Sequence, residues 1–94
     1  MKALRLTPAA YADIDRIWDY TADLWGIEQA ESYTDDLQVA CESIANGNKI
    51  GRPSTRRSIN KLRCGAHFIY YRIAADQVEI IRILHGKHDV ERHL

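Results

Sequence analysis

Two amphipathic segments follow one another with only Gly26 between them, and this junction limits the possible folds more than any other feature of the sequence. Thr7-Pro8 is a hydroxyl N-cap followed by proline at the first helical position, so the first helix starts there. The second helix runs over residues 27–46 and ends before Gly47. Helices joined so closely must fold back on each other as an antiparallel hairpin. Apolar side chains at helical spacing mark the expected inner faces: Tyr11, Ile14, Ile17, Trp18, Trp25, then Ile27, Ala30, Tyr33, Leu37, Ala40, Cys41 and Ile44.

The polar side of the first helix is marked by three aspartates, Asp13, Asp15 and Asp19, which we expect on the solvent face. Both tryptophans lie on the opposite, apolar stripe, so we expect them in the core.

Strand patterns flank the helical hairpin on both sides. Residues 3–6 alternate and stop at Pro8, which fits a short strand. After a glycine-rich and basic loop over residues 47–60, residues 61–64, 67–74 and 78–85 form three strand-like runs, the last two rich in β-branched and aromatic side chains. The sequence therefore predicts one α+β domain spanning residues 1–94: an N-terminal strand and a helical hairpin packed on a three- to four-stranded antiparallel sheet.

The last two strands allow a register to be predicted. If Ala74 pairs with Gln77, Arg72 lies opposite Glu79 and both faces of the hairpin are largely apolar. Since the helices can cover only one face, the second should be hidden by something else, such as a partner. In this register one face holds Ile69, Tyr71, Ile73, Val78, Ile80, Arg82 and Leu84, and the other holds Phe68, Tyr70, Arg72, Glu79, Ile81, Ile83 and His85.

Charge is distributed unevenly along a chain whose formal net charge is zero. Residues 1–48 carry three basic and nine acidic side chains, and residues 49–94 carry ten basic and four acidic ones. A basic half indicates a surface for an anionic or acidic partner. No run approaches the roughly 20 apolar residues of a membrane span, and the N-terminus has no apolar signal-peptide region. We therefore expect a cytoplasmic protein with no membrane contact and with two free cysteines.

Candidate chemistry rests on the basic residues of the second half. Arginine can hold a phosphate while histidine or tyrosine moves protons, so a metal-free ribonuclease is one interpretation, and a solvated loop with strand-end charges is the other. His85, His88 and Asp89 are metal-ligand types, but nothing completes a tetrahedral site, so no metal or cofactor is expected. Cys64 is expected to be a packed strand residue rather than a nucleophile.

Several segments taken together resemble the ParE branch of the RelE/ParE toxin superfamily, in order and over almost the whole chain. The most specific pair is Ile17-Trp18-Asp19-Tyr20 with Arg82-Ile83-Leu84-His85-Gly86. The other matching segments are Leu6-Thr7-Pro8, Ala12-Asp13-Ile14, Trp25-Gly26, Gly51-Arg52, Leu62-Arg63, the run from His67 to Arg72, Ile80-Ile81 and Asp89.

The resemblance implies a type II toxin that inhibits DNA gyrase by binding, without catalysis. It implies neutralisation by a ParD-like antitoxin whose ribbon-helix-helix part binds operator DNA, so that operator DNA is reached only through the antitoxin. RelE-like relatives instead cut mRNA on the ribosome, commonly with a tyrosine near the C-terminus that this tail lacks. His85 and His88 keep the ribonuclease alternative open, and a non-toxic interaction domain is a third.

Site residues follow from this reading as expectations. The tail closes the strand that carries Arg82, so a basic cluster near the C-terminus is the candidate gyrase contact: Arg82, His85, Lys87, His88 and Arg92. Apolar anchors on the helical hairpin and arginines of the basic loop are the candidate antitoxin contacts: Trp18, Tyr33, Leu37, Arg52, Arg56 and Arg57.

Overall fold

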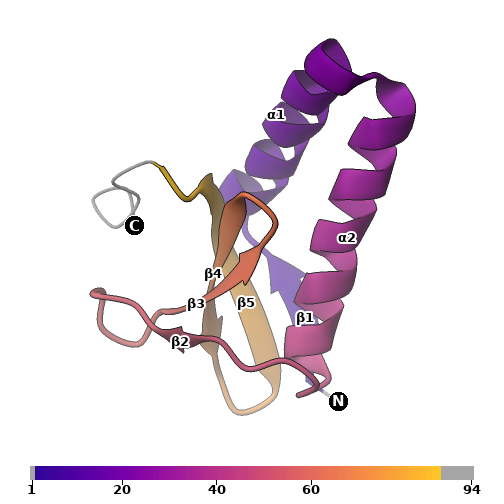
Figure 1. Ribbon diagram of the computed structural model, residues 1–94. Coiled ribbons are helices and arrows are strands. Elements are labelled where there is room, and N and C mark those ends of the chain that lie inside the picture. The colour runs from indigo at the N-terminus through magenta and orange to yellow at the C-terminus, as the bar shows by residue number, and fades with distance from the viewer. Residues whose placement is uncertain (1, 88–94) are drawn as a thin grey trace.

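The computed structural model describes residues 2–87, and it confirms an α+β domain with a helical hairpin packed on a sheet (Figure 1). Helix α1 spans Pro8–Trp25 and helix α2 spans Ile27–Ala45. Thr7 caps α1 by accepting a hydrogen bond from the Ala10 amide, and Gly26 joins the helices with a positive φ of 94°. Neither helix is long and apolar enough to cross a membrane.

Within residues 2–87 the sheet has five strands in the order β1-β5-β4-β3-β2, where three or four were expected, because Arg52–Pro53 in the basic loop pairs with β3 as a short edge strand. Strands β3, β4 and β5 form an antiparallel meander, as the sequence predicts. The N-terminal strand was expected in an antiparallel sheet, but β1 pairs in parallel with β5, because the helical hairpin returns the chain to the far side of the meander. The strands are β1 Ala3–Leu6, β2 Arg52–Pro53, β3 Asn60–Cys64, β4 His67–Ile73 and β5 Gln77–His85.

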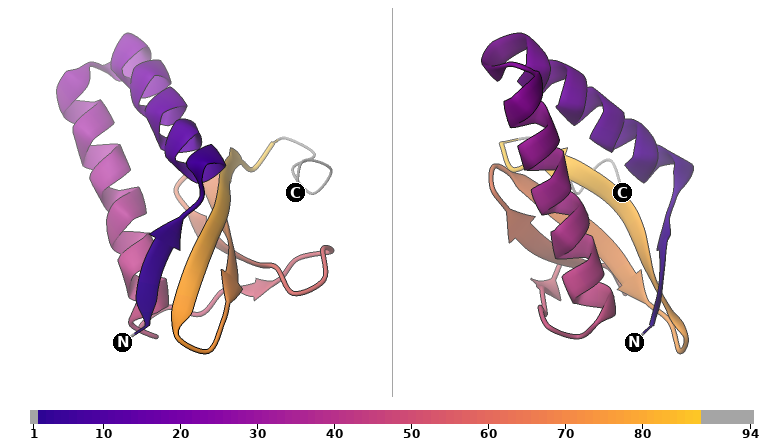
Figure 2. Two further views of the ribbon diagram at one scale, coloured as in Figure 1. Left: turned by 180° about the vertical axis from the view of Figure 1, so that it is seen from behind. Right: turned by 90° about the vertical axis from the view of Figure 1, so that its right-hand side faces the viewer.

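Both helices lie on one face of the sheet (Figure 2, right). Between them and the sheet lies the main core, to which α2 contributes Leu37 and Ile44, β4 Tyr71 and β5 Ile80. The other face carries a smaller apolar cluster around the fully buried Tyr70. Ile59 covers part of this cluster because the turn before β3 folds back, with the Ser54 amide donating to the Ile59 carbonyl at 2.9 Å. The predicted second apolar face therefore exists, and the chain covers part of it itself.

The register of β4 and β5 is correct near the turn and wrong beyond it. Ala74 bonds with Gln77 and Arg72 lies opposite Glu79, as predicted. A β-bulge then occurs between Tyr70 and Tyr71, and it exchanges the faces of the residues that follow in β5. Ile83 therefore enters the main core, although it was expected on the opposite face from Ile80. Leu84 correspondingly packs in the smaller cluster with Phe68.

The tip of the helical hairpin projects beyond the sheet (Figure 1). Trp25 was expected in the core, but it lies at this tip with 73% of its surface exposed. Its helical phase is that of the core stripe, yet none of the strands β1–β5 extends far enough to cover the tip (Figure 1). Tyr20, Leu24 and Ile27 are exposed in the same region, whereas Trp18, nearer the sheet, is half-buried.

Candidate functional site

A hollow of about 640 Å³ lies between α1 and the second half of β5. It forms where β1 ends and α1 begins, so that the helix rather than a strand flanks β5. Its lining brings together three of the predicted gyrase contacts, Arg82, His85 and Lys87, with residues of α1 that lie far from them in the sequence. The lining residues are Asp13, Arg16, Ile17 and Tyr20 from α1, and His67, Arg82, Ile83, Leu84, His85 and Lys87 from the sheet side.

Thr7 and Asp13 form hydrogen bonds with the backbone of β5 beyond the end of β1. The pairing of β1 with β5 stops at Leu6 opposite Ile80, and the next backbone groups of β5 need other partners. Thr7 donates from its amide to the Ile80 carbonyl at 3.0 Å and from Oγ1 to the Ile81 carbonyl at 2.7 Å. The amide of Ile83 then donates to Asp13 Oδ2 at 2.9 Å. Thr7 and the first turns of α1 thus satisfy the backbone groups of β5 that lie beyond the end of β1.

The same carboxylate binds Arg82 through two parallel hydrogen bonds. Arg82 Nε donates to Asp13 Oδ2 at 2.7 Å and Nη2 donates to Oδ1 at 2.8 Å, while Arg16 also donates to Oδ1. Asp13 is 3% exposed, and the hydrogen bond it accepts raises the pKa of Arg82. Asp13 was expected on the solvent face, and this is wrong. Its position three residues after Ala10 and four before Ile17, both buried, places it on the inner stripe.

Arg82 is therefore a positioning residue more than a free contact. Its side chain is 23% exposed, and its charge is compensated by Asp13. Glu79 is bound instead by Arg5 and Arg72. Asp89 lies outside the described residues.

Two histidines and a tyrosine stand at the strand end of the hollow. His67 and His85 lie opposite each other on β4 and β5. Their rings are arranged edge to face, with the ring centroids 5.3 Å apart. Tyr33 Oη accepts from the Ala66 amide at 3.0 Å and lies 2.7 Å from His67 Nδ1. Burial raises the pKa of Tyr33. The Lys87 amide donates to His85 Nδ1 at 3.1 Å.

The Tyr33 hydroxyl rests against Gly65, which has a φ of 60°. A Cβ added at Gly65 would meet Tyr33 Oη at 2.6 Å, whereas a Cβ at Gly47, also at positive φ, would meet nothing within 4 Å. We expect Gly47→Ala to destabilise the fold by about 1 kcal/mol through backbone strain. Gly65→Ala should cost about 1–3 kcal/mol more, because Tyr33 must move. Urea unfolding of both variants measures the difference, and equal losses would contradict it.

The predicted antitoxin contacts do not all reach the surface. Leu37 was expected to contact the antitoxin, but it is completely buried between α2, α1 and the sheet, and this places it in the core. Tyr33 is partly buried beside His67, and Trp18 is half-buried on α1. The three predicted arginine contacts are exposed: Arg52 lies on β2, and Arg56 and Arg57 lie in the turn that follows it. Of the gyrase candidates, His88 and Arg92 lie outside the described residues.

Both cysteines are placed as packed side chains. Cys41 is fully buried, and desolvation raises its pKa to about 12. Cys64 is partly buried beside the core, and desolvation raises its pKa as well. Because the thiolate is the nucleophile, a raised pKa makes both thiols poor nucleophiles at neutral pH.

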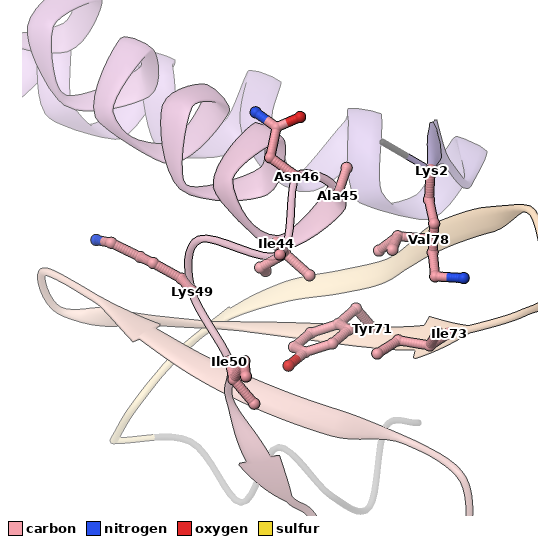
Figure 3. Close-up of a pocket in the computed structure, with 10 residues that line it drawn as sticks. Lys2, Ile44, Ala45, Asn46, Lys49, Ile50, Tyr71, Ile73 and Val78 are labelled. Carbon is pink, nitrogen blue, oxygen red and sulfur yellow. The ribbon is translucent and has the colours of Figure 1, made fainter.

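A second hollow, of about 560 Å³, lies at the opposite end of β5 (Figure 3). Ile44, Tyr71, Ile73 and Val78 line it, and Ile50, which is 85% exposed, borders it. The tyrosine hydroxyl accepts from the Gly51 amide at 2.7 Å, which fixes the loop after α2 against β4. The lining is mostly apolar, with Lys2 and Lys49 as its charged members.

Comparison with protein families gives a match over most of the chain. The family described as "ParE toxin of type II toxin-antitoxin system, parDE" matches residues 4–90. A protein named Toxin ParE1 from Mycobacterium tuberculosis is 40% identical over 92 residues, covering 95% of this chain and 94% of the relative. Toxin ParE1 from Caulobacter vibrioides is 41% identical over 96 residues, covering 100% and 99%.

Solved structures show the same fold. A chain of the chromosomal ParDE system from P. aeruginosa superposes with a TM-score of 0.82 at 26% identity, covering 90% of this chain and 96% of that one. A chain of the DinJ-YafQ complex from E. coli superposes with a TM-score of 0.63 at 7% identity, covering 90% and 93%. The latter likeness is one of fold alone.

Proposed function

We propose, from the premise that this chain belongs to the ParE toxin family of type II toxin–antitoxin systems, that it acts in the cytoplasm by binding and inhibiting DNA gyrase. The contact is the basic rim of the hollow beside α1, formed by Arg16, His85 and Lys87. Arg82 positions this rim through its hydrogen bonds to Asp13. The observation that carries the proposal is the charge of this hollow. Among residues 2–87 its lining has three cationic side chains, those of Arg16, Arg82 and Lys87, and one carboxylate, that of Asp13, so it favours an acidic or phosphate-bearing partner.

Binding rather than catalysis is supported by the partners that the site residues already have. A ribonuclease needs an arginine free to hold a phosphate, but Arg82 has both of its inward donors on Asp13. His85 has one ring nitrogen bound to the Lys87 amide. These contacts fix the shape of the rim, which suits recognition of a surface.

Ribosome-dependent mRNA cleavage is the second candidate. It is favoured by one observation: the ring centroids of His67 and His85 are 5.3 Å apart, and the Tyr33 hydroxyl lies 2.7 Å from His67 Nδ1. Two neighbouring imidazoles can act as acid and base if a phosphodiester lies at the mouth of the hollow.

The antitoxin is proposed to be ParD-like and to reach operator DNA through its own ribbon-helix-helix part. Its toxin-binding segment covers apolar surface near Trp18 and Tyr33, and its acidic residues pair with Arg52, Arg56 and Arg57. A stable complex of this kind buries about 1,200 Å² or more. Co-expression with a ParD-like antitoxin followed by purification of a stoichiometric complex tests it, and separate elution of the two chains would contradict it.

Induction of the toxin in cells separates gyrase inhibition from mRNA cleavage. Gyrase inhibition predicts an SOS response, filamentation and gyrase–DNA cleavage complexes with intact bulk mRNA. Ribosome-dependent cleavage predicts cut transcripts and rapid translation arrest without DNA breaks. The matched variant is His67→Gln/His85→Gln, which should abolish transcript cleavage if the histidines are catalytic. Normal supercoiling by purified gyrase in excess toxin would overturn the gyrase proposal.

A further inference from the structure

The tip of the helical hairpin presents apolar side chains to solvent. Leu24, Trp25 and Ile27 are 56%, 73% and 62% exposed where the two helices join. Asp23 and Glu28 flank them, and both carboxylates are exposed and form no ion pair within the described part of the chain. The tip is therefore an apolar group between two negative charges. Exposed apolar groups with a polar border are typical of protein contact sites.

The second hollow, at the other end of α2, has the complementary character. Figure 3 shows the side chains of Lys2 and Lys49 on opposite sides of this hollow, with apolar side chains between them. Its lining, among residues 2–87, includes no carboxylate. Ile50 and Ile73 are 85% and 52% exposed at its border. An apolar floor between two cations fits an apolar anchor side chain that is flanked by acidic residues.

The tip cannot reach the hollow of its own chain. The two features lie at opposite ends of α2, whose 19 residues span about 28 Å. A second copy can supply the tip, and the charges of the fold favour this pairing. Residues 8–45, which hold both helices, carry nine acidic side chains and one basic side chain, whereas residues 46–75 carry seven basic and no acidic ones. Two antiparallel copies bring the acidic helices of each beside the basic segment of the other.

We infer that two copies of this chain associate through these surfaces, with the tip of each copy seated in the second hollow of the other. Trp25 is the anchor, because a tryptophan side chain buries about 150–250 Å² and is enriched among the residues that dominate interfaces. A two-fold axis forms the tip–hollow contact twice, so the pair closes as a dimer instead of growing into a filament. This association is independent of gyrase inhibition.

Sedimentation velocity of the purified chain over a concentration series tests the inference. The parent should be mainly dimeric at about 100 µM, which corresponds to a dissociation constant of about 10 µM. Trp25→Ala removes the anchor from both contacts. A loss of about 30-fold at each contact weakens the dimer by about 1,000-fold, so this variant should be monomeric at the same concentration. Tyr11→Ala is the matched control, because Tyr11 is an exposed aromatic residue at the other end of α1, and it should dimerise as the parent does.

A mixture of two variants tests the pairing of tip with hollow. Ile50→Glu places a carboxylate at the border of the hollow, where the acidic tip would dock, so this variant alone should also be monomeric. Mixed with Trp25→Ala, it should associate about 30-fold more tightly than either variant alone, because the intact tip of one chain fits the intact hollow of the other. Pairing of tip with tip would leave Ile50→Glu dimeric, and pairing of hollow with hollow would leave Trp25→Ala dimeric. Either result overturns the inference.

A monomeric parent at about 100 µM, or a mixture that associates no better than its two components, also overturns the inference. Both substituted side chains are exposed, so each variant should keep the Tm of the parent, which shows that lost association is not lost folding. The gyrase proposal is judged separately, by supercoiling. Gyrase inhibition by a monomeric parent refutes the inference only, and dimerisation with normal supercoiling refutes the gyrase proposal only.

Discussion

Replacing Asp13 with alanine should destabilise the protein by about 3 kcal/mol or more, the largest stability loss expected for a polar residue of this chain. The carboxylate is 3% exposed and accepts from Arg82, from Arg16 and from the Ile83 amide. Its removal leaves the partly buried guanidinium of Arg82 uncompensated and the edge amide of β5 without a partner. Breaking a buried pair in this way costs about 3–5 kcal/mol. In a domain of this size, 3 kcal/mol corresponds to a fall in Tm of roughly 12–24 °C.

The control for this experiment lies on the same helix. Asp15 is exposed, so Asp15→Ala should stay within about 0.5 kcal/mol of the parent in urea unfolding. A double variant, Asp13→Ala/Arg82→Met, should recover part of the loss, because it removes the uncompensated charge. If Asp13→Ala unfolds within 1 kcal/mol of the parent, the carboxylate does not join α1 to β5 as described.

Reversing the charge of Lys87 should cause the largest loss of toxicity among the described rim residues. Lys87 is exposed at the mouth of the hollow, and its amide, not its ammonium, bonds to His85. Lys87→Glu therefore changes the charge facing the partner and leaves the backbone contact in place. At a charged contact central to an interface, about 2 kcal/mol is lost, which corresponds to roughly 30-fold more toxin for half-inhibition of gyrase supercoiling.

Lys49→Glu is the matched control, because it makes the same charge change beside the second hollow, at the other end of β5. It should leave gyrase inhibition unchanged, and both variants should keep the Tm and antitoxin affinity of the parent. Equal inhibition by the parent and Lys87→Glu would remove Lys87 from the contact. Arg82→Ala is unsuited to this purpose, since it disturbs the buried Asp13 and lowers stability as well. Alanine replacements of His88 and Arg92 extend the test to the remaining candidates.

Local rules in the sequence determined the helical hairpin and the antiparallel meander. The hydroxyl and proline at Thr7-Pro8 start α1, and Gly26 adopts a positive φ that other residues avoid. The short Ala75-Asp76 turn aligns Arg72 with Glu79. Each of these features depends on neighbours within a few residues, so periodicity and turn chemistry were enough to predict them. The basic C-terminal cluster was also visible, because Arg82, His85 and Lys87 lie close together in the chain.

Only the tertiary structure decided what depends on contacts between distant segments. The bulge at Tyr70 and Tyr71 placed Ile83 inside, and a strand pattern read with a strict period of two cannot show such an extra residue. The extent of the sheet decided that Trp25 is exposed and Leu37 buried, although both lie on the same kind of apolar stripe. The parallel pairing of β1 with β5 left an open edge, and Asp13 fills it from 70 residues away in sequence. In the sequence a carboxylate at this position indicates a solvent-exposed residue. It becomes the centre of the site only because the partly buried Arg82 and the backbone amide of Ile83 meet it in the fold.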